Sequence, residues 1–164
     1  MAGMFPTMVA DPNDRNRRFS GEVGDTWPSP LRTAYWFFVA AAVMMLVTGV
    51  MLLTTKFPPD LDPDLLKTVK LNTRLVAVGN IILALCLTAC AAYFEKGSKR
   101  ARRWASGFIF LTIFLNFAGF FVGVVGLVSI VIVGLLAFGA FFMFRPAANA
   151  FMDHKSGDLW KGVR

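Results

Sequence analysis

Histidine is almost absent from this chain of 164 residues, which contains only His154, close to the carboxyl end. A four-helix haem protein of the cytochrome b type needs paired histidine ligands, so the sequence excludes that class. Asp60, Asp62 and Asp64 alternate like the start of a calcium loop, but Leu65 and Leu71 stand where such a loop needs Gly and Glu. We therefore expect neither a metal centre nor a cofactor.

Charged residues are absent from three long apolar stretches, residues 33–55, 75–94 and 104–144. About 20 apolar helical residues cross the ~30 Å hydrocarbon core of a bilayer, so each of the first two stretches fits once. The third has 41 residues and would be about 60 Å long as one helix. It is expected to fold back within GFFVGVVG, where three glycines supply backbone freedom.

This division predicts an all-α integral membrane protein that crosses the cell membrane several times. The expected order is four transmembrane helices with a tight hairpin between the third and the fourth. The predicted spans are residues 33–55, 75–94, 104–122 and 126–144. Together, residues 33–144 form one transmembrane domain.

The two ends of the chain are polar. Residues 1–32 are interrupted by prolines and glycines and are expected to be a disordered cytoplasmic segment, or one laid on a partner. Residues 145–164 are expected to form a cytoplasmic tail. Within it, Ala148, Phe151, Met152 and Trp160 are side chains that could dock on something, and a loosely held tail is the alternative.

Lys and Arg are unevenly distributed about the predicted spans. Thirteen lie on the side that carries the termini, and four, Lys56, Lys67, Lys70 and Arg74, lie on the other. Basic residues are retained on the cytoplasmic side, so both termini are predicted to be cytoplasmic. In the outer segment, Asp62 is a predicted N-cap and Pro63 a predicted first helical residue. We expect a short interfacial helix there, leading into the second span.

The segment EKGSKRARRW, residues 95–104, holds five of the thirteen inner bases. These are Lys96, Lys99, Arg100, Arg102 and Arg103. Such density is typical of nucleic-acid binding in a soluble protein, but the flanking apolar stretches argue against that partner. We predict a short inner loop that fixes topology and attracts anionic lipid head groups, with a pure topology signal as the alternative.

Ionisable side chains are missing from the predicted spans, where proton-coupled transporters and redox proteins place them. The nearest carboxylate, Glu95, falls in the inner loop, which excludes a small multidrug exporter. Cys86 and Cys90 are four residues apart, unlike a CxxC redox motif, and are interpreted as small packing residues. We therefore expect no enzymatic activity.

Small and polar residues repeat at helical spacing within the second and third spans, as they do in membrane helix interfaces. The residues predicted to pack against other helices are Ala77, Asn80, Ala84, Thr88, Thr112, Asn116, Gly119 and Gly123. The two asparagines are expected to face other helices and to hydrogen-bond there, because an amide facing lipid is costly. The periodicity leaves open whether those helices belong to this chain or to a partner.

Three short motifs lie beside the predicted spans: WPSPLRTAYWFF, GSKRARRW and FRPAANAF. Together they resemble the uncharacterised four-span membrane proteins of actinobacteria. Such proteins are similar to accessory subunits of large membrane assemblies, including the cytochrome bcc and oxidase respiratory supercomplex. The resemblance implies a non-catalytic accessory or scaffolding subunit with other integral membrane subunits as partners. A passive transport or lipid-handling protein is the second hypothesis, and a membrane-bound regulator is the third.

Overall fold

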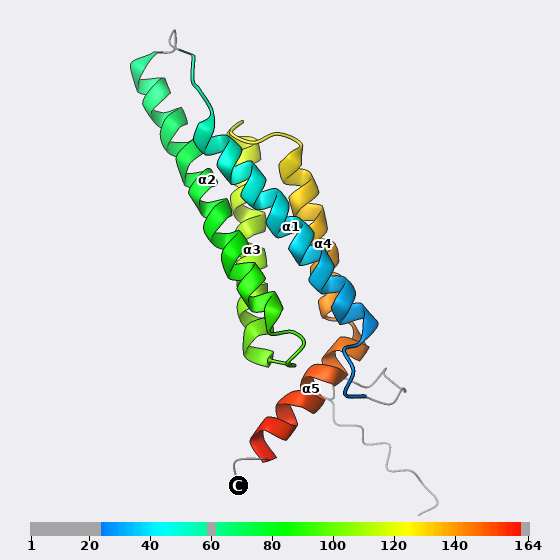
Figure 1. The fold of residues 1–164 in the computed structure, drawn as a ribbon. Helices are drawn as coiled ribbons and strands as arrows, with labels where there is room; N and C mark the ends of the chain where they lie inside the picture. The colour runs from blue at the N-terminus through cyan, green and yellow to red at the C-terminus, as the bar shows by residue number, and fades with distance from the viewer. Residues whose placement is uncertain (1–23, 59–61, 162–164) are drawn as a thin grey trace, which may run out of the picture.

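The computed structural model describes residues 24–58 and 62–161, with side chains up to residue 156. The chain forms five helices in this part, and no β-strand occurs among the described residues. The helices are α1 (Ser29–Thr54), α2 (Pro63–Ala92), α3 (Lys99–Phe121), α4 (Val128–Met143) and α5 (Pro146–Lys161). Helices α1 to α4 run alongside one another, and α5 crosses beneath one end of the bundle (Figure 1). The all-α prediction is confirmed, whereas residues 1–23 of the amino-terminal segment lie outside the described residues.

The start of α2 matches the predicted capping signal. The Asp62 carboxylate accepts hydrogen bonds from the backbone N–H groups of Asp64 (2.9 Å) and Leu65 (3.4 Å), and Pro63 opens the helix. The predicted short interfacial helix does not form an element of its own, however, because α2 continues unbroken for 30 residues into the second predicted span. At 1.5 Å per residue it is about 45 Å long, so its first turns extend beyond the other helices (Figure 1).

The predicted turn between the third and fourth apolar stretches is present. Helix α3 ends in a Schellman motif, in which the N–H of Val124 bonds to the carbonyl of Gly119 (2.9 Å) and that of Gly123 to Phe120 (3.0 Å). Gly123 has a φ of +74°, a conformation that favours glycine. The chain therefore reverses where the sequence predicts it.

Three helices, α1, α2 and α3, are long and apolar enough to cross a membrane. Helix α4 has 16 residues, or about 24 Å, which is short of a ~30 Å core. It ends before Phe144, the predicted end of the fourth span, and the helical path bends by 62° into α5. If α4 and α5 count as one broken span, the chain has four candidate spans. The described helices are thus those of an all-α, multi-pass membrane protein, with three to four candidate spans.

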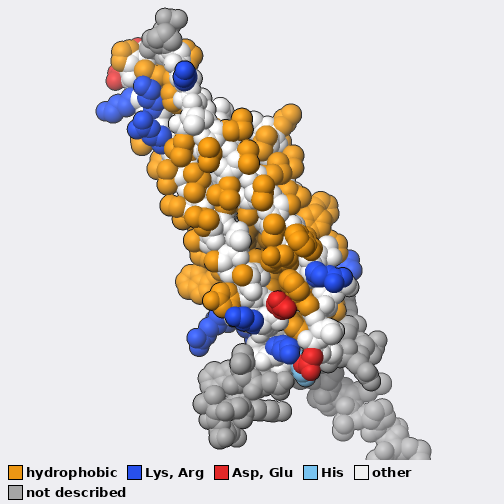
Figure 2. Space-filling view, viewed as in Figure 1, with side chains coloured by type: hydrophobic (Ala, Val, Ile, Leu, Met, Phe, Trp, Pro, Cys, Tyr) orange, Lys and Arg blue, Asp and Glu red, His pale blue; other side chains and the backbone are white. Residues whose placement is uncertain are grey.

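Close approach between helices depends on small residues. A Cβ atom on Gly139 of α4 would lie 2.5 Å from Cε1 of Phe38 of α1, and one on Gly49 of α1 would lie 2.9 Å from the carbonyl oxygen of Ala77 of α2. Phe38 also meets the ring of Phe94 edge to face at 5.9 Å. Apolar side chains cover the middle of the visible face, and Lys and Arg gather at its two ends (Figure 2).

Candidate functional sites: a buried amide pair and the α5 junction

A pair of asparagine side chains joins α2 to α3 inside the apolar body. Asn80 and Asn116 are both fully buried, and Nδ2 of Asn116 donates to Oδ1 of Asn80 at 2.9 Å. The same nitrogen also donates to the carbonyl oxygen of Thr112, at 3.0 Å. Both amides thus face a neighbouring helix of the same chain.

Some polar atoms of this region lack a hydrogen-bond partner within the described part of the chain. They include Nδ2 of Asn80, Oδ1 of Asn116 and Oγ of Ser129, and all three are buried. Asn116 and Ser129 also line a cavity of about 10 Å³ between α3 and α4. The amide pair therefore retains a donor and an acceptor, so it can form further hydrogen bonds.

Six of the eight predicted packing residues lie in the interior. Thr112, Ala77, Ala84 and the two asparagines are fully buried, and Gly119 is buried where α3 approaches α2. A Cβ atom on Gly119 would lie 2.9 Å from Val125 and 3.3 Å from Val76. These small residues let the two helices approach each other closely.

Two of the eight lie elsewhere. Thr88 is exposed, and its hydroxyl donates to the carbonyl oxygen of Ala84 at 2.8 Å. The buried face of α2 continues through Leu87 and Ala91, which leaves Thr88 about 100° around the helix from Leu87. Gly123 is also exposed, because it follows the end of α3 and forms the turn.

The basic segment is more ordered than a loop. Ser98 caps α3, with its Oγ accepting from the N–H of Ala101 at 3.2 Å. Four of the five bases therefore belong to the first turns of α3, and only Lys96 lies in the connection from α2. The prediction that all five lie in a loop is corrected in this respect, because the Ser98 cap starts the helix at Lys99.

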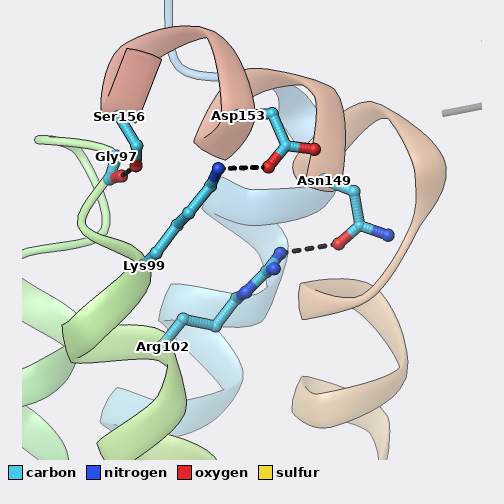
Figure 3. Close-up of polar contacts among 6 residues, drawn as sticks. All are labelled: Gly97, Lys99, Arg102, Asn149, Asp153 and Ser156. Atoms are coloured by element: carbon cyan, nitrogen blue, oxygen red, sulfur yellow. Dashed lines mark hydrogen bonds and ion pairs between the residues drawn. The ribbon is translucent and has the colours of Figure 1, made fainter. Parts of the chain in front are cut away.

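Arg102 points toward α5 instead of toward solvent. Its side chain is buried, and its Nη1 donates to Oδ1 of Asn149 at 2.6 Å (Figure 3). The guanidinium also lies 5.4 Å from the ring centre of Phe144. Asn149 is itself fixed, since its Nδ2 donates to the carbonyl oxygen of Phe144 at 3.1 Å. A base that the sequence assigned to topology thus holds the start of α5.

Two further contacts join α5 to the α2–α3 connection. Nζ of Lys99 forms an ion pair with Asp153 at 2.6 Å, and Oγ of Ser156 donates to the carbonyl oxygen of Gly97 at 3.0 Å (Figure 3). Gly97 has a φ of +66°, and a Cβ atom there would collide with the Cβ of Lys155. Gly97 is therefore required both by the backbone conformation and by the approach of α5. We call this set of contacts the α5 junction: Gly97, Lys99, Arg102, Asn149, Asp153, Lys155 and Ser156.

The apolar face of α5 completes the attachment. Ala148, Phe151 and Met152 are buried and belong to the main hydrophobic core. Of the two alternatives for the tail, docking is thus the one observed, and the surface is the chain's own helical body. The side chain of Trp160 lies outside the described residues.

Lys155 also reaches the segment that precedes α1. Its Nζ donates to Oδ1 of Asp25 at 2.8 Å. This hydrogen bond, together with the positive charge of Lys155, holds the pKa of the Asp25 carboxyl below its ordinary value. The contact ties the start of the described chain to its last helix.

The other three bases of the segment, Lys96, Arg100 and Arg103, are exposed. Nζ of Lys96 lies 5.0 Å from the ring centre of Tyr93, and the exposed Trp104 follows Arg103 directly. Such aromatic residues are typical of a membrane interface. The five bases therefore divide into two that bind α5 and three that are available to another partner.

No group of three or more His, Cys, Asp or Glu side chains that could hold a metal ion occurs within residues 24–58 and 62–156. Cys86 and Cys90 are free thiols. In comparisons with protein-family models, with curated proteins and with solved structures, nothing matched this chain.

Proposed function

We propose that this protein is a non-catalytic accessory or scaffolding subunit of a larger membrane assembly, with a respiratory complex as the specific candidate. The observation that carries this proposal is a row of phenylalanines on the outer face of α3. Its members, which we call the α3 phenylalanine stripe, are Phe110, Phe114, Phe117 and Phe121.

The stripe has the spacing of a helix-binding surface. Its members follow one another at steps of four, three and four residues, which places them on one side of the helix. Phe110 is 74% exposed and Phe121 is 80% exposed, so neither contributes to the core of this chain. Phenylalanine offers a large and stiff contact surface, which suits it to the groove of a neighbouring helix. Lipid alone requires only apolar side chains of any shape.

Purification in native lipid discs tests the proposal. We expect a tagged chain to carry stoichiometric membrane subunits, identified by mass spectrometry. If the partner is respiratory, haem absorbance and oxidase activity will travel with it. A lone monomer in the discs would contradict the accessory role, and partners without haem would contradict only its respiratory form.

A stripe variant makes the test specific. Replacing the four phenylalanines with Leu keeps the surface apolar but removes the rings, so we expect the partners to be lost while the monomer remains folded. The matched control replaces Val43, Val47 and Val50, which are exposed on α1, with Leu. Equal retention of partners by the stripe variant and the control would contradict a role for the stripe.

The buried amide pair supports the second candidate, a passive transport or lipid-handling protein. Asn80, Asn116 and Thr112 place polar groups inside the apolar body, and a small cavity lies beside Asn116. Replacing both asparagines with Leu should then abolish flux into liposomes, and unchanged flux would remove this candidate.

A membrane-bound regulator remains the third candidate. Its test replaces Lys96, Arg100 and Arg103 with Gln and leaves Lys99 and Arg102 in place, because those two hold α5. Topology is verified first, since inner bases also set orientation. We expect the variant to lose its effect on the partner that it regulates, while α5 stays docked on the helical bundle.

A further inference from the structure

The elbow between α4 and α5 contains an open groove. It has a volume of about 650 Å³ and is lined by Ala137, Ala140, Phe141, Phe144, Arg145 and Pro146. The alanines lie on α4, within the apolar stretch, and Arg145 and Pro146 lie at the bend into α5. The groove is thus apolar along its length and cationic at one end.

Arg145 supplies this cationic end. Its guanidinium lies 5.1 Å from the ring centres of both Phe141 and Phe142, and the residue is exposed. It forms no ion pair with any carboxylate of the described residues. Stacking on the two rings holds the side chain beside the groove. Its charge is left for an external anion.

The surroundings add positive potential. Helix α5 begins at Pro146 with no acidic residue in its first turn, so the positive end of its dipole adjoins Arg145. The guanidinium of Arg102 lies against the ring of Phe144, another residue of the groove. No carboxylate lines the groove to offset these charges.

We propose that this elbow binds a phospholipid with a negatively charged head group. The phosphate accepts hydrogen bonds from the Arg145 guanidinium, and one acyl chain lies along Ala137 and Ala140. A small free anion would pair with Arg145 but leave the apolar walls of the groove uncovered. A neutral lipid would cover the walls but leave the charge of Arg145 without an anion. The proposal depends on the membrane placement of α4 and not on the accessory role, so the two can fail separately.

Native mass spectrometry of the full chain in detergent tests this site. Phosphatidylglycerol and phosphatidylcholine with identical acyl chains are added in turn, and bound lipid is counted. We expect wild-type protein to prefer phosphatidylglycerol. Arg145→Gln should weaken that binding on the order of tenfold, as expected for loss of one charge-assisted contact. Arg145→Lys should retain most of it, since the charge remains.

Two further variants distinguish binding in the groove from non-specific attraction of anionic lipid to the basic surface. Arg103→Gln removes one exposed charge outside the groove and should change binding less than twofold, because water screens a solvent-exposed ion pair. Ala137→Phe narrows the groove and should weaken both lipids, provided that the melting temperature is unchanged. Equal losses in Arg145→Gln and Arg103→Gln would overturn the proposal, as would unchanged binding in Arg145→Gln. A partner helix crosslinking to Ala137 in place of lipid would also overturn it.

Discussion

Two asparagine contacts that join helices in this protein differ in their surroundings. Asn116 meets Asn80 inside the apolar body, where both residues are fully buried, whereas Asn149 meets a charged partner, Arg102, at the end of the bundle. Water cannot replace a lost partner in the body, because lipid and apolar side chains surround it. At the α5 junction, the side chains of Lys99 and Asp153 are 46% and 38% exposed, so this end of the bundle is partly open to water. The same residue type therefore joins helices in a region that excludes water and in a region that is partly open to it.

The largest effect is expected from breaking the amide pair. Asn116→Leu leaves the buried Asn80 amide without the hydrogen bond that Asn116 donates to its Oδ1, which should lower the free energy of unfolding by about 1–2 kcal/mol. Thermal unfolding in detergent measures the loss. The double variant Asn80→Leu with Asn116→Leu should recover part of it, because no unpaired amide remains.

Thr88→Val is the control on α2, since Thr88 is exposed and bonds only to its own helix. We expect a change within about 0.5 kcal/mol there. If Thr88→Val lowers the free energy of unfolding as much as Asn116→Leu does, the hydrogen bond between the two asparagines contributes no more stability than an exposed threonine.

Gly97→Ala is expected to have the next largest effect, confined to α5. A left-handed conformation costs a residue with a Cβ atom about 1–2 kcal/mol, and the new Cβ collides with Lys155. Hydrogen exchange should show faster exchange at residues 146–156 and unchanged exchange in α1 to α3.

Gly107→Ala is the matched control for this substitution. Gly107 lies in α3, and a Cβ atom there would meet nothing within 4 Å outside the backbone of its own helix, so Ala should be neutral or stabilising by up to about 1 kcal/mol. Faster exchange throughout the bundle of the Gly97→Ala protein would contradict a local role of the α5 junction.

Arg102→Gln is expected to have a smaller effect than Gly97→Ala. It keeps a polar group near Asn149 but removes the charge and the contact with Phe144. About 1 kcal/mol of local stability should be lost, seen as faster exchange of α5. Arg100→Gln, a neighbouring exposed base, is the control and should leave α5 unchanged. Equal rates of hydrogen exchange at α5 in Arg102→Gln and Arg100→Gln would contradict the assignment of Arg102 to the α5 junction.

The contrast between the two regions also shows what the sequence can predict. Asn80 and Asn116 were expected to face other helices because an amide facing lipid is costly, and helical spacing aligns each of them with small residues. Thr88 lies outside the buried face of α2, because four-residue steps drift around a helix with 3.6 residues per turn. The buried small and polar positions of α2 and α3 thus follow from periodicity, apart from positions at the edge of the buried face.

The α5 junction could not be predicted in the same way. Arg102 and Asn149 are 47 residues apart, and their meeting depends on the 62° bend after α4. Pro146 indicates that a helix ends or bends there but not in which direction. A buried Arg also has the same sequence signature as an exposed one. The division of the five bases therefore required the three-dimensional structure.

The smallest expected effect concerns the pair of Asp25 and Lys155. Because the pKa of Asp25 is lowered in the folded protein, the pair contributes stability above the usual aspartate pKa of about 4 and loses it as pH falls through the lowered value. The side chain of Asp25 is 80% exposed, so solvent screens the pair and the bundle should keep its melting temperature. Exchange at α5 should instead rise slightly on acidification. Asp25→Asn should give the raised exchange already at neutral pH and remove this part of the acid response. If the Asn variant and the wild type respond identically to acid, the contact between Asp25 and Lys155 does not help to hold α5.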